Sequence, residues 1–182
     1  MNISLRINKI MARRIHLSNL IIISILLPSC GEGDGSELIP PFNLFYYVAV
    51  GDLNNDGLQD VATCYTYISD SPPHPGYVSV YLQNLEQPAT FLGAETYPVG
   101  NDPVSIAIGD LTGDGRPDIV TANNHGEKGV SVLLQDPILQ GKFLPVVNYT
   151  SAPNTTSVCI GDLNNDGRND LAVSDNALSI LF

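Results

Sequence analysis

Three short segments of this chain place carboxylate and amide side chains at a spacing suited to a hard metal ion. Segments 52–60, 110–118 and 162–170 each present an oxygen-bearing side chain at loop positions one, three, five and nine. Each also has a glycine at position six, and position seven could contribute its backbone carbonyl. In order, the candidate ligands at positions one, three, five, seven and nine are Asp52, Asn54, Asp56, Leu58 and Asp60; Asp110, Thr112, Asp114, Arg116 and Asp118; and Asp162, Asn164, Asp166, Arg168 and Asp170.

Calcium is the ion that this pattern favours. Ca²⁺ takes about 6–8 oxygen ligands, whereas Mg²⁺ retains its water and avoids cages made wholly of protein. Without a cation, each pair of carboxylates ~4 Å apart repels by about 4 kcal/mol at an effective dielectric constant near 20. We therefore expect up to three bound Ca²⁺, one per loop, with the second loop weakest because Thr112 offers a single hydroxyl.

A simpler alternative is a turn rich in Asp and Asn, because these side chains cap their own backbone in Asx-turns. An Asx-turn explains a single loop of this kind, but it does not explain why three carboxylates recur at the same positions in three loops. An EF-hand is excluded, because position twelve requires a bidentate Glu and is Thr63, Thr121 or Val173 here.

The loops lie within a longer internal repeat that must position them. Residues 48–63, 106–121 and 158–173 read VAVGDLNNDGLQDVAT, IAIGDLTGDGRPDIVT and VCIGDLNNDGRNDLAV, and their first aspartates are 58 and 52 residues apart. Apolar segments 78–82, 130–134 and 178–182 repeat as well, as do the pairs Phe91…Tyr97 and Phe143…Tyr149. The pairs Val48/Val50, Ile106/Ile108 and Val158/Ile160 alternate with small residues, which predicts strands with one buried face.

Four short strands per unit, repeated in tandem, predict an all-β chain of propeller-type blades. We expect four-stranded antiparallel sheets over residues 41–182, as an incomplete or open propeller of two full blades and part of a third. The loops and their flanking strands resemble the FG-GAP/VCBS repeats of exported bacterial proteins, which are similar to the calcium-bearing blades of integrin α subunits. The resemblance implies that each loop joins the first two strands of a blade and holds one Ca²⁺, in a family that closes rings of about seven blades.

The N-terminal segment predicts export. A basic start over residues 1–14 precedes an apolar run over residues 15–27, which is shorter than the roughly 20 residues that span a membrane. The Leu27-Pro28-Ser29-Cys30 end resembles a bacterial lipoprotein signal, although Pro28 departs from the usual small or β-branched residue. We expect a signal peptide over 1–29, a lipidated Cys30 with a flexible tether over 30–40, and placement on the outer membrane or cell surface. An ordinary signal peptide is the alternative.

Charge excludes some partners. The chain has 8 Lys and Arg against 19 Asp and Glu. Four of the basic residues precede residue 30, so residues 30–182 hold 4 basic and 19 acidic residues, a net charge of −15. This argues against nucleic acid and against attraction to anionic lipid, so we expect membrane contact through the lipid anchor only.

No catalytic motif stands out. His74 and His125 lie in turn-like sequence and are expected to be solvated, and Cys64 and Cys159 are expected to be small buried residues. We expect a non-enzymatic scaffold that binds an extracellular protein or glycan through its variable loops. The alternatives are the N-terminal part of a longer exported enzyme whose catalytic residues lie beyond residue 182, or a truncated frame without function.

Overall fold

Every described element of the computed structural model is a β-strand, as the alternating sequence pattern predicts. The structure describes residues 46–66, 72–87, 89–127, 129–150, 155–174 and 177–181, all within one unit of the chain, residues 38–182. The predicted signal peptide, Cys30 and the tether lie outside the described residues. The strands are β1 (Tyr46–Gly51), β2 (Asp60–Thr66), β3 (Gly76–Tyr81), β4 (Glu95–Val99), β5 (Asn101–Gly109), β6 (Asp118–His125), β7 (Val130–Leu133), β8 (Val147–Tyr149), β9 (Ser157–Gly161), β10 (Asp170–Ser174) and β11 (Leu178–Leu181).

These strands form three antiparallel sheets, one for each sequence repeat. The first sheet has the order β1-β2-β3-β4, the second β5-β6-β7-β8, and the third β11-β10-β9. In each, a glycine at the end of the first strand pairs with position nine of the acidic loop, as Gly51 does with Asp60, Gly109 with Asp118 and Gly161 with Asp170. No sheet closes on itself, so the all-β, open propeller-like prediction is confirmed.

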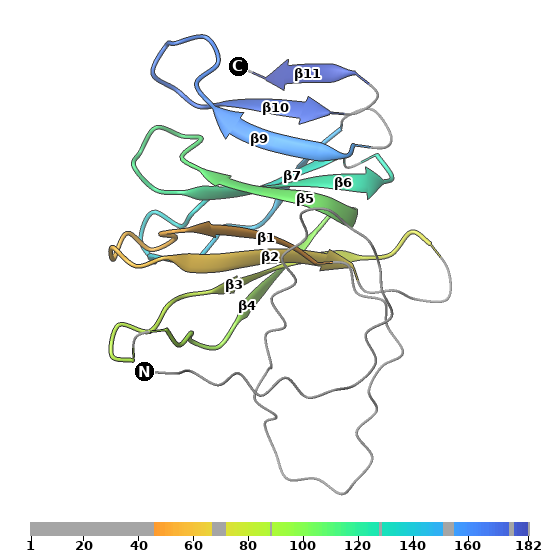
Figure 1. The fold of residues 1–182 in the computed structure, drawn as a ribbon. Helices are drawn as coiled ribbons and strands as arrows, with labels where there is room; N and C mark the ends of the chain where they lie inside the picture. The colour runs from red at the N-terminus through yellow and green to blue at the C-terminus, as the bar shows by residue number, and fades with distance from the viewer. Residues whose placement is uncertain are drawn as a thin grey trace, which may run out of the picture. The chain divides into compact units, whose positions relative to one another are not determined.

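The sheets stack in chain order, and the second sheet uses opposite faces for its two neighbours (Figure 1). We call the face that meets the following sheet the forward face, and the other the rear face. Cross-strand partners share a face, so the registers assign each side chain to one of them. The forward face of the first sheet, with Ala62, Cys64, Val78 and Val80, packs against the rear face of the second sheet, with Ile106, Ile108, Ile119 and Leu133.

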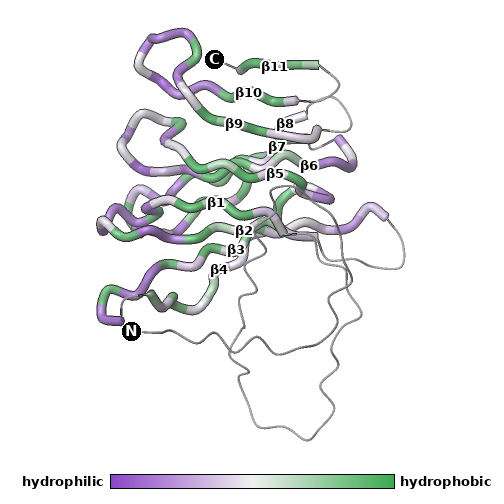
Figure 2. Tube along the Cα trace, viewed as in Figure 1, coloured by the Kyte–Doolittle hydropathy of each residue, from purple (hydrophilic) through white to green (hydrophobic). Residues whose placement is uncertain are grey.

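The same packing recurs one sheet later. The forward face of the second sheet, with Val120, Ala122, Val130 and Val132, packs against the rear face of the third, with Val158, Ile160, Leu171 and Val173. Figure 2 shows the corresponding apolar colouring along the strands and the hydrophilic loops at their ends. Among the described residues, the second sheet is therefore covered by a sheet on both faces, whereas the first and third sheets are each covered by a sheet on one face.

The predicted burial of Val48 and Val50 and that of Cys159 are both wrong, because these residues lie on sheet faces without a neighbouring sheet among the described residues. Val48 is 38% exposed and Val50 57% exposed, although the equivalent Ile106 and Ile108 pack against the first sheet. Cys159 is exposed, whereas Cys64 is buried, and burial raises the pKa of the Cys64 thiol to about 12. The sequence pattern sets which face a side chain occupies, but a neighbouring sheet decides whether that face is buried.

Candidate metal-binding loops

The aspartate at position one organises the turn of each acidic loop. Asp52 accepts a hydrogen bond from the backbone N–H of Asp56 at 3.0 Å and another from that of Gly57 at 2.8 Å. The second and third loops repeat both bonds: Asp110 accepts from Asp114 at 3.2 Å and from Gly115 at 2.8 Å, and Asp162 accepts from Asp166 at 3.2 Å and from Gly167 at 2.9 Å. The three loops thus share one backbone conformation.

Glycine at position six is required by that conformation. Gly57, Gly115 and Gly167 have φ angles of 86°, 80° and 86°, in the left-handed region that L-residues with side chains rarely adopt. Position four also has a positive φ, of 56° at Asn55 and 61° at Asn165. Asn tolerates this region better than most residues, so Asn at position four is itself a sequence signal of this turn.

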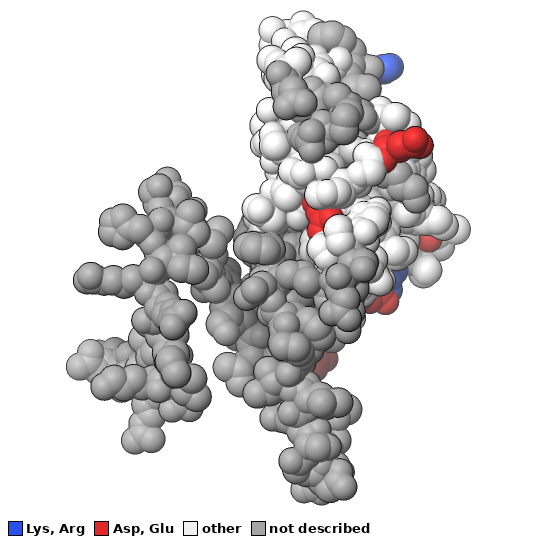
Figure 3. Space-filling view, turned by 90° about the vertical axis from the view of Figure 1, so that its right-hand side faces the viewer, with Lys and Arg blue, Asp and Glu red and all other residues white. Residues whose placement is uncertain are grey.

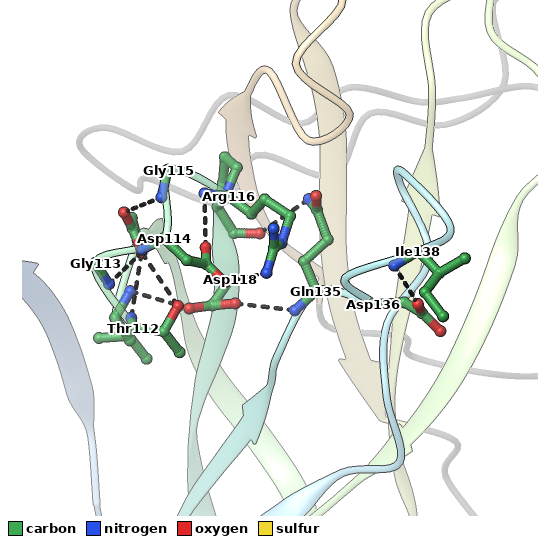
Figure 4. Close-up of polar contacts among 12 residues, drawn as sticks. Thr112, Gly113, Asp114, Gly115, Arg116, Asp118, Gln135, Asp136 and Ile138 are labelled. Carbon is green, nitrogen blue, oxygen red and sulfur yellow. Dashed lines mark hydrogen bonds and ion pairs between the residues drawn. The ribbon is translucent and has the colours of Figure 1, made fainter.

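The carboxylate at position five receives a polar donor in every loop. Asn54 Nδ2 donates to Asp56 Oδ2 at 2.9 Å, and Asn164 Nδ2 donates to Asp166 Oδ2 at 3.1 Å. In the second loop, the Arg116 guanidinium takes this place and forms an ion pair with Asp114 Oδ2 (Figure 4). The other oxygen of each carboxylate accepts the backbone N–H of position seven, which is Leu58 at 2.8 Å, Arg116 at 2.9 Å and Arg168 at 2.8 Å.

The aspartate at position nine is buried and holds the loop to the sheet. Asp118 accepts the backbone N–H of Leu111 at 3.0 Å and that of Gln135, which follows β7, at 2.9 Å. Asp60 accepts the N–H of Leu53 and of Gln83, both at 2.7 Å, and Asp170 accepts that of Leu163 at 2.9 Å. Asp60, Asp118 and Asp170 are 0%, 2% and 3% exposed. Each therefore has a second role as an internal cap of backbone amides, which the loop sequence alone does not predict.

The loop carboxylates affect one another's ionisation. Burial raises the pKa of Asp118; the amides of Gln135 and Leu111 oppose that rise, while the nearby charges of Asp114 and Asp110 add to it. Burial raises the pKa of Asp60 in the same way, with contributions from Asp56 and Asp52. Burial also acts on Asp110, but four backbone amides outweigh it and hold its pKa below the usual value. In the first two loops, the charges at positions one and five are therefore close enough to repel the charge at position nine.

The three loops lie at the same end of their sheets (Figure 1) and are joined to each other. Asn55 Nδ2 donates to the Gly115 carbonyl at 2.9 Å, which links the first loop to the second. Asn169 Nδ2 donates to the Asp110 carbonyl at 2.8 Å, which links the third loop to the second. Figure 3 views the opposite side, where the described surface is mostly uncharged with scattered acidic side chains.

His125 is solvated as expected, with its side chain 57% exposed, whereas the His74 side chain is only 21% exposed and lies against Asp102. His125 ends β6, and its Nδ1 lies 3.3 Å from Asp102 Oδ2. His74 Nδ1 lies 3.1 Å from Asp102 Oδ1, and the Asp102 N–H donates to the His74 carbonyl. Asp102 thus holds the insertion before β3 to the start of β5. Its φ of 50° marks a bend that the sequence pattern did not predict.

The donor set fits a calcium ion in its chemistry. The loops offer hard carboxylate, amide and hydroxyl oxygens, and Oδ2 of position five already faces either the N–H dipole of a neutral amide or a charged guanidinium, donors that a cation can replace. Position nine keeps free lone pairs after accepting two amides, because each oxygen has two. No set of three or more His, Cys, Asp or Glu side chains in the described parts of the chain is gathered closely enough to hold a metal as it stands. Binding would therefore draw the side chains inward.

Comparison with known proteins agrees with this geometry. The model of the FG-GAP-like repeat family matches residues 52–121 and again residues 110–173, and both matches start at the first aspartate of an acidic loop. The chain belongs to the FG-GAP-like repeat family. Each family match begins after the first strand of a sheet, covers the other three strands of that sheet and ends within the second strand of the next, so the two matches overlap over residues 110–121, the second loop and the start of β6.

One relative extends the FG-GAP-like comparison. A protein of Plasmodium falciparum (isolate 3D7), described as a T-cell immunomodulatory protein homolog, is 31% identical over 146 residues, which cover 72% of this chain and 20% of the relative. The chain therefore spans about a fifth of the length of that protein. Within the described residues, no helix is long and apolar enough to cross a membrane.

Proposed function

We propose that this chain is an exported, calcium-stabilised FG-GAP-like repeat module that binds an extracellular protein or glycan. FG-GAP-like repeats suggest an extracellular, adhesion-type module. The observation that carries the calcium proposal is the repetition of one hydrogen-bond pattern in three acidic loops, with the carboxylates of positions one, five and nine bonded to equivalent backbone amides each time. An isolated Asx-turn needs one carboxylate, whereas each of these loops holds three, and in the first two loops the charges at positions one and five repel the one at position nine.

Calcium would neutralise that repulsion. It would be held by the side chains of positions one, three, five and nine and by the backbone carbonyl of position seven, and so would link the loop to position nine, which is fixed to the sheet. The ion supplies charge and coordination only, and the expected gain is stability rather than catalysis. The second loop should bind most weakly, because Thr112 supplies one hydroxyl and the Arg116 guanidinium competes for Asp114. Asn54 and Asn164 carry no charge, and their side-chain carbonyl oxygens already lie within the loop, where each accepts the backbone N–H of position five.

The test is thermal unfolding of the full chain in ~1 mM Ca²⁺ and in chelator. A ligand that binds only the folded state stabilises it by RT ln(1 + [L]/Kd), so even a weak site raises the melting temperature. Asp56→Asn and Asp166→Asn should each reduce this calcium-dependent rise. Asp136→Asn is the matched control, because Asp136 caps a turn through Ile138 and Leu139 outside the acidic loops and should leave the rise unchanged. Equal melting temperatures with and without Ca²⁺ would refute the calcium proposal.

We place the module on the outer membrane or cell surface through a lipid on Cys30, on the resemblance of residues 27–30 to a lipoprotein signal. Cys30→Ser should release the protein from the membrane fraction of a bacterial host, whereas Cys159→Ser should leave it there. If Cys30→Ser fractionates with membranes as before, the anchor is refuted and an ordinary signal peptide is favoured.

Binding without catalysis is supported by the roles already assigned to the acidic residues. Nine of the 19 Asp and Glu residues lie in the three loops, where they cap backbone amides. A catalytic part beyond residue 182 remains the alternative function. A glycan or cell-surface array probed with the labelled chain would show saturable, calcium-dependent binding. If the chain instead turns over a labelled substrate panel, the non-enzymatic proposal is wrong.

A further inference from the structure

The two end sheets of the stack present faces that the internal repeat identifies as halves of the same packing interface. The forward faces of the first and second sheets are each covered by the rear face of the next sheet. The third sheet has the corresponding forward face, and the first sheet has the corresponding rear face. Both ends carry exposed apolar side chains.

Five equivalent positions show the difference on the forward face. In the second sheet, Val120 and Ala122 are 0% exposed, Val130 2% and Val132 6%. In the third sheet, the residues at these positions are Ala172, Ser174, Leu178 and Ile180, of which Leu178 is 71% exposed and Ile180 41%. The fifth position is Cys159, which is exposed, where the second sheet has the half-buried Ala107. The third sheet thus keeps small and apolar residues on a face with no sheet against it among the described residues.

The glycine at the end of the first strand gives an independent indication. A Cβ added to Gly51 would lie 3.2 Å from Ile108 of the next sheet, and one added to Gly109 would lie 2.7 Å from Ile160. Glycine at these positions lets the following isoleucine approach the backbone. At the equivalent Gly161, an added Cβ would meet no atom within 4 Å, so a docking space of the same kind is open there.

The residue that would fill the space is present at the other end of the chain. Val50 occupies the repeat position of Ile108 and Ile160, directly before the glycine, and it is 57% exposed on the rear face of the first sheet. Val48, equivalent to Ile106 and Val158, is 38% exposed beside it. Valine has the Cβ and Cγ2 atoms that make the closest contacts in the Gly109–Ile160 pair. The rear face of the first sheet therefore complements the forward face of the third.

We propose that the third sheet of one copy docks onto the first sheet of a second copy, so that Val50 of one copy packs against Gly161 of the other. The docking surface continues the series of interfaces that the chain makes twice within itself. An asymmetric, head-to-tail contact of this kind generates a ring if its rotation closes and an open chain of copies if it does not. This inference uses the sheet faces alone and does not depend on calcium binding.

Sedimentation velocity of the full chain in a mild non-ionic detergent, over a range of protein concentrations, tests the proposal. Wild type should form oligomers in whole multiples of the chain mass. Val50→Lys blocks only the first-sheet end, and Leu178→Lys blocks only the third-sheet end, so each variant alone should stay monomeric. An equimolar mixture should form dimers and nothing larger, because one intact face of each kind is present. Leu139→Lys, at a position 57% exposed in a turn of the second sheet, is the matched control and should assemble like wild type.

Gly161→Ala provides a second, milder probe. Since the added methyl group meets none of the described residues within 4 Å, it should leave the melting temperature unchanged and raise the dissociation constant of assembly at least tenfold. A wild-type chain that stays monomeric at all concentrations would overturn the proposal, and would indicate that residues 1–45 or a different protein covers these faces. Assembly that persists in either lysine variant, or a mixture that stays monomeric, would overturn it as well.

Discussion

Replacing Asp118 by alanine separates the structural role of position nine from its proposed role in calcium binding. The carboxylate of Asp118 is 2% exposed and accepts the backbone N–H groups of Leu111 and Gln135. Asp118→Ala leaves both donors without this acceptor in a protein interior. A buried group left unsatisfied costs about 1–3 kcal/mol, so two of them cost about 2–6 kcal/mol.

Part of this loss in stability is offset, because the ionised Asp118 carboxylate is itself destabilised by its surroundings. Its pKa is raised by burial and by the charges of Asp114 and Asp110, so removing the charge relieves an unfavourable term. We therefore expect Asp118→Ala to lower the free energy of unfolding by about 2–4 kcal/mol in chelator. With an m-value of about 2 kcal/mol/M, the midpoint of urea unfolding should fall by about 1–2 M.

The assay is urea unfolding of the full chain in excess chelator, followed by far-ultraviolet circular dichroism. Asp114→Ala is the matched control, because Asp114 is exposed and its carboxylate bonds to residue 116, within its own loop. It should change the free energy of unfolding by less than about 1 kcal/mol in chelator while still weakening calcium binding. If Asp118→Ala is as mild as Asp114→Ala without calcium, then position nine is not an internal cap and the reasoning is wrong.

Two further predictions concern the contacts between sheets. Gly109→Ala should destabilise the chain by about 1–3 kcal/mol through overpacking, because the new Cβ would lie 2.7 Å from Ile160. Gly161→Ala is the control and should be neutral in the same melting experiment. Equal effects of the two substitutions would contradict the stacking of the sheets. Glu95 of the first sheet pairs with Lys142 of the second, and the hydrogen bonds from Lys142 and from Tyr97 hold its pKa below the usual value. The stabilisation is thus present above the unfolded-state pKa and lost as the pH falls through the folded-state pKa. Glu95→Gln should remove that part of the acid dependence and cost less than about 1 kcal/mol at neutral pH, and an unchanged acid profile would refute the contribution of this pair.

The strand order and the placement of the loops could be predicted from the sequence, because the repeat applies one pattern three times. Alternation in β1, β5 and β9, and the shared glycine and aspartate positions, were sufficient to identify four-stranded units and their connecting loops. The geometry of position six was also predictable, since the turn requires a positive φ there.

Other features depend on contacts between distant parts of the chain. The capping role of Asp60 and Asp118 requires amides 23 and 17 residues away, at Gln83 and Gln135, which no local pattern reveals. The exposure of Val50 and Cys159 likewise depends on which sheets have a neighbour. Their sequence context matches that of residues packed against another sheet in the other repeats.

The central claim is that the acidic loops are calcium sites, and direct measurement of stoichiometry tests it most closely. Isothermal titration of the chelator-stripped full chain with Ca²⁺, checked by equilibrium dialysis and elemental analysis, should show saturable binding of up to three ions per chain. Asp166→Asn should remove or weaken one site while leaving the others. A chain that retains no calcium at ~1 mM free ion, the range in which weak extracellular modules bind, would contradict the account and leave the loops as hydrogen-bonded turns.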